Sequence, residues 1–231
     1  MSDLVLSLFP GIGLLDRAFE EEGFTVVRGP DVLWGGDVRR FQPPAGVFAG
    51  VIGGPPCQSF SAMRAFEPTS GQKHGNLIPE FERCVREARP AWFLMENVRG
   101  APLPVVEGYA VHSVLLNNRW LGERQTRLRR FSFGSPGGAR LAFDVAALEH
   151  SERAATVLAG HDDSAAVREA QGRSRTLAEL CELQGLPADF LKDSPFSVWG
   201  QRKVIGNGVP IPMGRAVARA VKRAMAKEIA A

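Results

Sequence analysis

The order of apolar runs and glycines in the first 27 residues constrains the fold more than any other feature. Leu4–Phe9 is an apolar run typical of a buried strand, and it leads directly into the glycine-containing turn Pro10–Gly13. Apolar residues recur at helical spacing from Leu14 to Glu22, Gly23 ends this helix, and Phe24–Val27 predicts a second strand. Strand, glycine turn, helix and strand open a Rossmann-like unit, in which a nucleotide-like ligand binds at the helix N-terminus.

The glycine turn is not a complete dinucleotide fingerprint. A GxGxxG motif needs three glycines, whereas Gly11 and Gly13 stand here without the third. The hypothesis of an NAD-type dehydrogenase therefore rests on two residues. Asp31 follows the second strand and suits a ribose diol, although an aspartate beside a proline is more often a turn residue. The passage from Asp31 to Asp37 is too short for a full crossover helix.

A stiff loop follows the next apolar run. Val47–Ile52 predicts a buried strand, and Gly53–Pro56 then restricts the backbone immediately before Cys57. Because ligands of open α/β sheets bind at the carboxyl ends of the strands, a thiol at this point is placed as a nucleophile would be. The ordinary alternative is a small buried apolar cysteine. The prolines before it and the polar Gln58 and Ser59 after it favour the nucleophile.

A carboxylate marks the end of another predicted strand. Pro79 to Ala88 has the periodicity of a helix, and Ala91–Met95 is a continuous apolar strand that ends in Glu96. Glu96 is therefore expected at the same sheet edge as Cys57. A carboxylate beside an apolar strand end is expected to have a raised pKa, which suits it to hold or donate a proton. The alternative is a residue that caps a turn.

Arginines are dense in the middle of the chain. Gly108–Leu116 alternates as a strand should, and Arg119–Arg130 follows with five arginines. Gln125, Arg127 and Arg129 share a period of two, so they project to one face if the segment is extended. Two interpretations remain open: a solvated edge strand, or a row of guanidinium groups that contacts phosphates or a base.

The C-terminal part adds helices. Thr176–Leu183 predicts a helix with Cys181 on its inner face, Val204–Pro210 reads as a glycine-flanked turn, and Pro212–Ile229 is an amphipathic helix. With the strands above, this pattern predicts an α/β fold: a mostly parallel central sheet with flanking helices.

Composition narrows the classes of function. The chain of 231 residues fits one large domain, and its net charge of +3, carried mostly by arginine, allows a polyanionic partner without requiring one. Three cysteines without paired spacing favour neither a disulfide framework nor zinc, so no metal is expected. No apolar run approaches the ~20 residues of a membrane span, and no basic leader follows Met1. We therefore expect a cytoplasmic protein with no membrane partner.

Taken together, these blocks resemble the cytosine-C5 DNA methyltransferase family, in its linear order and over nearly the whole chain. The matching motifs are Phe9–Gly13 (FxGxG), Pro55–Gln58 (the PCQ loop), Glu96–Val98 (ENV), Gln125–Arg129 (QxRxR), Arg175–Pro187 (ending in LQGxP) and Gly206–Pro210 (GNxVP). The resemblance implies a Rossmann-like S-adenosylmethionine-dependent methyltransferase fold, with S-adenosylhomocysteine as the product.

The resemblance also implies which residues bind the cofactor. Asp31 would meet its ribose, and the pair Asp37 and Val38 would face its adenine. The complete implied set is Phe9, Gly11, Ile12, Gly13, Asp31, Val32, Asp37, Val38, Pro55, Asn207, Gly208 and Val209.

The implied chemistry takes place on a cytosine flipped out of double-stranded DNA. Cys57 would add to C6 of the ring, and Glu96 would bind the N3 and amino edge. Arg127 would hold the O2 side, and Arg129 would support Glu96 or the loop. Implied DNA contacts come from Gln58, Ser59, Ser61, Gln125 and Arg130.

The chain departs from the family after Phe133. Relatives usually insert a sizeable target-recognition domain there, whereas about twenty residues precede Ala155 here, too few for an independent core. We expect a catalytic and cofactor-binding core at 1–133, a reduced recognition region at 134–174 and a return to the core at 175–231. A monomer with a short or relaxed recognition site follows, of bacterial or phage origin, either solitary or in a restriction–modification system.

Two alternatives keep the same fold. One branch of the family methylates tRNA, although the loop PPCQ differs from the PCT-type loop of that branch. A catalytically silent, DNA-binding regulator would lack the nucleophile or the ENV glutamate, and both Cys57 and Glu96 are present.

Overall fold

The computed structural model describes residues 3–56, 75–145, 153–159 and 172–230. These residues form a six-stranded sheet with strand order β2-β1-β3-β4-β6-β5. The strands are β1 (Leu4–Leu8), β2 (Thr25–Arg28), β3 (Gly50–Gly53), β4 (Trp92–Asn97), β5 (Ala110–Asn117) and β6 (Leu128–Ser135). The first four in the order are parallel, and β6 runs antiparallel to β4 and β5. The predicted α/β fold with a mostly parallel sheet is confirmed.

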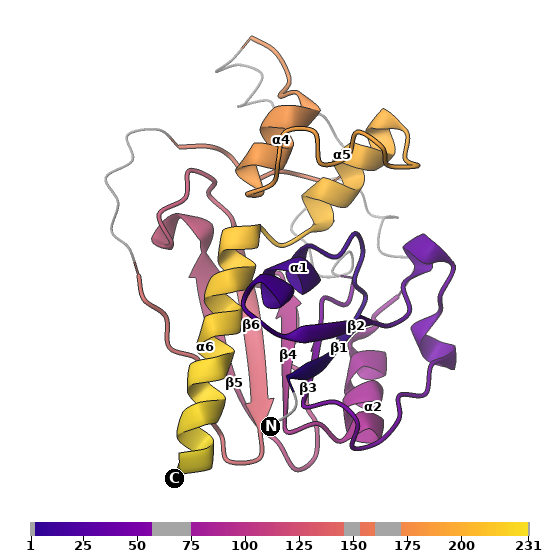
Figure 1. Cartoon of the computed structure of the whole chain (residues 1–231), viewed down its shortest axis with the longest axis vertical. Coiled ribbons are helices and arrows are strands. Elements are labelled where there is room, and N and C mark those ends of the chain that lie inside the picture. Colours follow the sequence, from indigo (N-terminus) through magenta and orange to yellow (C-terminus); the bar gives the residue numbers. More distant parts are fainter. Residues whose placement is uncertain (1–2, 57–74, 146–152, 160–171, 231) are drawn as a thin grey trace.

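Helices cover both faces of this sheet (Figure 1). They are α1 (Leu14–Glu21), α2 (Ile78–Ala88), α4 (Leu177–Leu183), α5 (Val198–Asn207) and α6 (Ile211–Ala230). Helices α1 and α6 lie together on one face and α2 lies on the other, while α4 and α5 lie beyond the end toward which β4 points. No helix in the described ranges is long and apolar enough to cross a membrane.

Alternation along the strands explains the two layers. Ile52 and Leu94 belong to the buried cluster that contains the apolar faces of α1 and α6. Their neighbours Val51 and Phe93 point the other way, into the cluster that contains α2. Successive side chains of a strand alternate between faces, so parallel strands buried on both sides read as continuous apolar runs.

Two element predictions are corrected by the structure. Strand β3 begins at Gly50 rather than at Val47, whose side chain is exposed. The stretch Val204–Asn207 is the last turn of α5 rather than a glycine-flanked turn. Ser197 caps the start of α5, and position 206 requires a glycine because a Cβ there would lie 2.2 Å from the Leu158 carbonyl oxygen.

The connection between β2 and β3 is abbreviated, as the spacing of the two aspartates predicts. Two single-turn 3-10 helices, η1 (Val32–Trp34) and η2 (Val38–Arg40), replace a crossover helix. Asp31 and Asp37 cap them by accepting hydrogen bonds from backbone N–H groups. The boundary expected at residue 133 falls inside β6, which continues to Ser135.

A buried carboxyl lies beneath the glycine turn. Asp16 in the first turn of α1 is fully buried, accepts a hydrogen bond from the Ser7 hydroxyl and pairs with Arg28 at 3.1 Å. Burial raises the pKa of Asp16 from 3.8 to about 6, against the opposing effect of Ser7 and Arg28.

This raised pKa predicts a pH-dependent stability. The native state holds the Asp16 proton more tightly than the unfolded chain does. The stabilisation that comes from this proton is therefore complete below pH 3.8, and it is lost as the pH rises through about 6. Relative to Asp16→Asn, the wild-type free energy of unfolding should fall by up to about 3 kcal/mol over this window. Urea unfolding at a series of pH values measures the difference, and parallel curves for the two proteins would contradict the assignment.

Candidate functional site

Two hydrogen bonds of Gly11 connect the glycine turn after β1 to the segment that follows β2. The Gly11 N–H donates to Asp31 Oδ2 at 2.8 Å, and the Gly11 carbonyl accepts from Trp34 Nε1 at 2.7 Å. Gly11 adopts φ +57°, and a Cβ at this position would meet no atom within 4 Å. The turn therefore presents an open space beside a fixed carboxylate.

The carboxylate of Asp31 is held by two backbone donors. Its Oδ2 accepts from Gly11, and its Oδ1 accepts from the Leu33 N–H at 2.7 Å. Each carboxylate oxygen retains capacity for a further hydrogen bond. The carboxylate of Asp31 is therefore fixed just after β2, where it can accept hydrogen bonds from a pair of vicinal hydroxyl groups. This is the role expected for Asp31 toward a ribose.

The residues expected to bind the cofactor after Asp31 differ in exposure. Val32 is exposed, and the Asp37 side chain caps η2 through the Arg39 N–H at 3.0 Å. Val38 is only 3% exposed and lies in the cluster that contains α2. Its side chain therefore packs in the core, and the expected contact of Val38 with the cofactor stays a prediction.

Trp34 was not singled out from the sequence. Its ring is half exposed, its Nε1 is bonded to the glycine turn, and its centroid lies 5.6 Å from that of Phe196. An indole donor close to a glycine turn has no fixed sequence spacing, so only the fold reveals the contact. Trp34 and Phe196 together connect the glycine turn to the segment before α5.

The GNxVP motif at the end of α5 lies next to the glycine turn. A Cβ on Gly208 would lie 2.4 Å from Leu14 Cδ1, so the backbone of Gly208 packs directly on the first residue of α1. Val209 is buried, and Asn207 is exposed at the end of α5. The structure thus brings the C-terminal motif next to the turn formed by Gly11 and Gly13.

The ends of β3 and β4 adjoin each other. The Asn97 side chain donates to the Pro55 carbonyl at 3.2 Å, and a Cβ on Gly54 would lie 3.2 Å from Glu96 Oε2. The stiff segment that ends at Pro56 therefore lies against the Glu96 carboxylate. The expected site residues Cys57, Gln58, Ser59 and Ser61 lie outside the described residues.

Glu96 and Arg129 form a partly buried ion pair. Arg129 Nε lies 2.9 Å from Glu96 Oε1, and the two side chains are only 18% and 13% exposed. Burial raises the pKa of Glu96, and the nearby guanidinium groups of Arg129 and Arg127 oppose this rise. A carboxyl group in this environment can hold a proton on a ring nitrogen, because its neutral form is favoured.

The position of Arg127 does not fit the expected contact with a base. Its side chain is 1% exposed, and its guanidinium donates to the carbonyls of Val157 at 2.8 Å, Gly206 at 2.9 Å and Gly208 at 2.9 Å. Arg127 therefore donates to backbone carbonyls, and of the two arginines it is Arg129 that forms the described ion pair with Glu96.

Gln125 and Arg130 differ from their expected roles at a DNA surface. Gln125 is 1% exposed and donates to the Leu183 carbonyl and to Gln184 Oε1, so it cannot contact DNA directly. Arg130 lies on β6 and donates to the Ala101 carbonyl at 2.6 Å, with part of its side chain accessible. Of the arginines in this segment only Arg127 is buried, whereas Arg124 is exposed and Arg119, Arg129 and Arg130 are partly buried.

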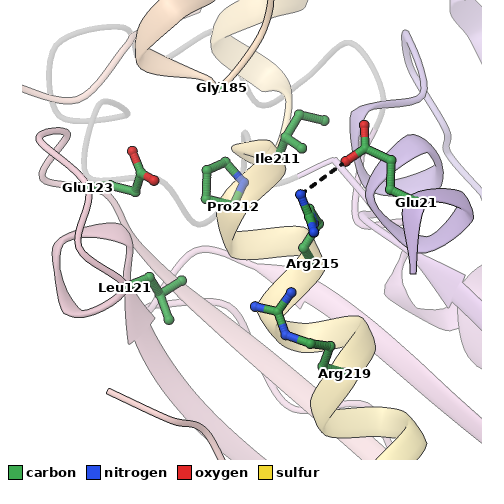
Figure 2. A pocket seen from close by; sticks show the side chains of 8 residues that line it. All are labelled: Glu21, Leu121, Glu123, Gly185, Ile211, Pro212, Arg215 and Arg219. Atoms are coloured by element: carbon green, nitrogen blue, oxygen red, sulfur yellow. Dashed lines mark ion pairs between the residues drawn. The ribbon is translucent and has the colours of Figure 1, made fainter. Parts of the chain in front are cut away.

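A separate surface cavity of about 370 Å³ lies between α6, α1 and the loop around Leu121 (Figure 2). Arg215 and Glu21 pair across it at 3.7 Å, and Arg215 and Arg219 also pair with Glu22. None of the predicted site residues lines this cavity. We therefore assign the candidate site to the strand ends.

Comparison with known proteins agrees with this geometry. The family model described as C-5 cytosine-specific DNA methylase matches residues 35–103. The chain is 30% identical to the Type II methyltransferase M.HgiDI of Herpetosiphon aurantiacus, over 58% of this chain and 52% of that protein. It is also 30% identical to the Type II methyltransferase M.NgoPII of Neisseria gonorrhoeae, over 56% of this chain and 47% of that protein.

The fold has solved counterparts. The structure of the methyltransferase EhMeth of Entamoeba histolytica superposes with a TM-score of 0.66 at 12% identity, covering 96% of this chain and 98% of that one. The architecture is that of S-adenosylmethionine-dependent methyltransferases. Within that architecture, the chain is similar to the C-5 cytosine-specific DNA methylase family, whose model matches residues 35–103, and to Type II methyltransferases. It spans about half the length of the curated relatives it matches.

The ion pair gives a prediction about proton affinity. Arg129 lowers the pKa of Glu96, so Arg129→Met should raise it further above its usual range. A ¹³C NMR titration of the glutamate carboxyl groups reports the change. Arg130→Met is the control, because the adjacent Arg130 is bonded to Ala101 instead. Equal Glu96 titration in the two variants would show that the pair is not formed.

Proposed function

We propose that this chain transfers the methyl group of S-adenosylmethionine to C5 of a flipped-out cytosine in DNA. The proposal rests on one observation: the residues expected to bind the cofactor and those expected to bind the cytosine lie at the same edge of the sheet. The turn at Gly11 with the Asp31 carboxylate lies at the ends of β1 and β2, and the Glu96–Arg129 pair lies beside Pro55 at the ends of β3 and β4.

The residues at the first two strand ends fit the cofactor. A Cβ on Gly11 would project into open space, and the Asp31 oxygens are oriented by backbone N–H groups toward the same turn. Gly208 closes the arrangement from the C-terminal side by packing on Leu14. When bound, the cofactor supplies an electrophilic methyl group on a sulfonium.

The residues at the other two strand ends fit the pyrimidine. Carbon 5 of cytosine is a weak nucleophile until a thiolate adds at C6, and Cys57, which directly follows Pro56, would supply this thiolate. Glu96, whose pKa is raised, would hold a proton at N3 during the addition. Arg129 would steady Glu96 and the O2 side of the ring. After methyl transfer, the C5 proton leaves to solvent, the Cys57–C6 bond breaks and aromaticity returns.

Access to the ring faces requires the base to leave the DNA stack. The roughly twenty residues between Phe133 and Ala155 are too few to fold as an independent recognition domain. The short segment around Ala154 and Val157 is bonded to Gln125 and Thr126 of the core. We therefore propose a short or relaxed recognition site and a catalytic unit that acts as a monomer.

Methyl transfer is tested with tritiated S-adenosylmethionine and duplex DNA, single-stranded DNA and tRNA in parallel. Label is expected in duplex DNA, and Cys57→Ala should reduce it at least about 10³-fold because the nucleophile is lost. Bisulfite sequencing of the product should show methylation at a site shorter than four bases. Label confined to tRNA would favour the RNA branch of the family, and no label in any substrate would favour a silent regulator.

Cofactor binding has an optical test. S-adenosylhomocysteine should change the tryptophan fluorescence, because the half-exposed indole of Trp34 is bonded to the glycine turn. The change should disappear in Trp34→Phe and persist in Trp199→Phe, since Trp199 lies on α5 against Lys203. An unchanged signal in Trp34→Phe would place the ligand away from this turn.

A further inference from the structure

A buried polar network joins three motifs that are far apart in the chain. The Gly208 carbonyl accepts from Arg127 at 2.9 Å and from the Gln184 side chain at 3.2 Å. Gln184 also donates to the Ile205 carbonyl and accepts from Gln125. QxRxR, LQGxP and GNxVP are therefore held by direct hydrogen bonds between buried side chains and one short piece of backbone.

The chemistry of a helix end explains why an arginine is suited to this place. The last carbonyls of an α-helix lack partners within the helix and carry its negative partial charge. Helix α5 ends at Asn207, and the Arg127 guanidinium donates to the carbonyls on either side, of Gly206 and Gly208. A buried cation is stabilised there because carbonyl oxygens accept hydrogen bonds from both of its terminal guanidinium nitrogens.

The hydrogen bonds of Arg127 also affect α1, because they hold the backbone that packs against its first residue. Gly208 lies on Leu14, and Leu14 directly follows Gly13, which adopts φ +79° as the cap of α1. A shift of the Gly208 backbone would therefore press on the first turn of α1, where the glycine turn ends. Arg127 thus reaches the cofactor side of the site through the backbone between Gly206 and Gly208.

The two arginines of the motif act in different places. Arg129 lies on β6 and pairs with Glu96, whereas Arg127 precedes the strand and enters the interior toward α5. We propose that Arg127 is a positioning residue for S-adenosylmethionine, and that Arg129 serves the pyrimidine. This inference rests on the proposed function and assigns one arginine of QxRxR to each of its two substrates.

Binding of S-adenosylhomocysteine to the purified chain tests the inference without DNA. Isothermal titration calorimetry should show affinity weakened about tenfold or more in Arg127→Lys, because a compact ammonium group lacks the planar fork whose two nitrogens reach carbonyls on separate segments. Arg129→Lys should bind as the wild type does. In steady-state assays, KM for S-adenosylmethionine should rise in Arg127→Lys while KM for DNA stays unchanged.

A matched buried arginine separates positioning from loss of stability. Arg175 is 3% exposed, and the described hydrogen bonds of its side chain run to the carbonyls of Ala155 and Thr156 rather than to residues 206–208. Arg175→Lys should lower the melting temperature yet keep the affinity for S-adenosylhomocysteine. If Arg127→Lys does not fold, Gln184→Met, which removes the second donor to Gly208, takes its place in the comparison.

Two results would overturn the inference alone: wild-type affinity in a folded Arg127→Lys or Gln184→Met protein, or equal weakening in Arg175→Lys. A wild-type chain that does not bind S-adenosylhomocysteine would contradict the proposed function itself. The two failures are therefore distinguishable within one set of titrations.

Discussion

The site depends on one geometric constraint, the shared direction of β2, β1, β3 and β4. Parallel strands end at the same sheet edge, so residues separated by dozens of positions become neighbours there. Asp31 after β2 and the turn after β1 form one half of the edge, and Pro55 after β3 and Glu96 at the end of β4 form the other. Two reactants placed at these halves would meet between them, which is what a group transfer requires.

Buried charge shapes this edge on both sides. Asp16 lies under the glycine turn with Arg28, and Glu96 lies under the proline segment with Arg129. In each pair burial raises the pKa of the carboxyl and the arginine opposes it. The consequences differ, because Asp16 has no open space beside it and affects stability, whereas Glu96 retains access and suits proton transfer.

The periodicity of the sequence predicts most of the helices and strands. The exceptions depend on contacts or strand boundaries that local periodicity does not encode. The sequence does not predict α5 because its two glycines are typical of turns, and the close approach of Leu158 that requires a glycine at position 206 is visible only in the structure. Gln125, Arg127 and Arg129 were expected on one face, but the chain is not a regular strand before Leu128. Period-two reasoning holds only inside a strand, so it could not separate the two arginines.

The sequence by itself determined the alternation of strands and helices, the glycine turn, the strand-end positions of Asp31 and Glu96, and the resemblance in motif order. These depend on local spacing and residue type, which no distant contact alters. The tertiary structure decided which arginine lies beside Glu96, that Val38 and Gln125 are interior, and that Trp34 is bonded to Gly11. The reason is physical: burial and hydrogen-bond partners depend on segments that meet only when the sheet and its helices have packed.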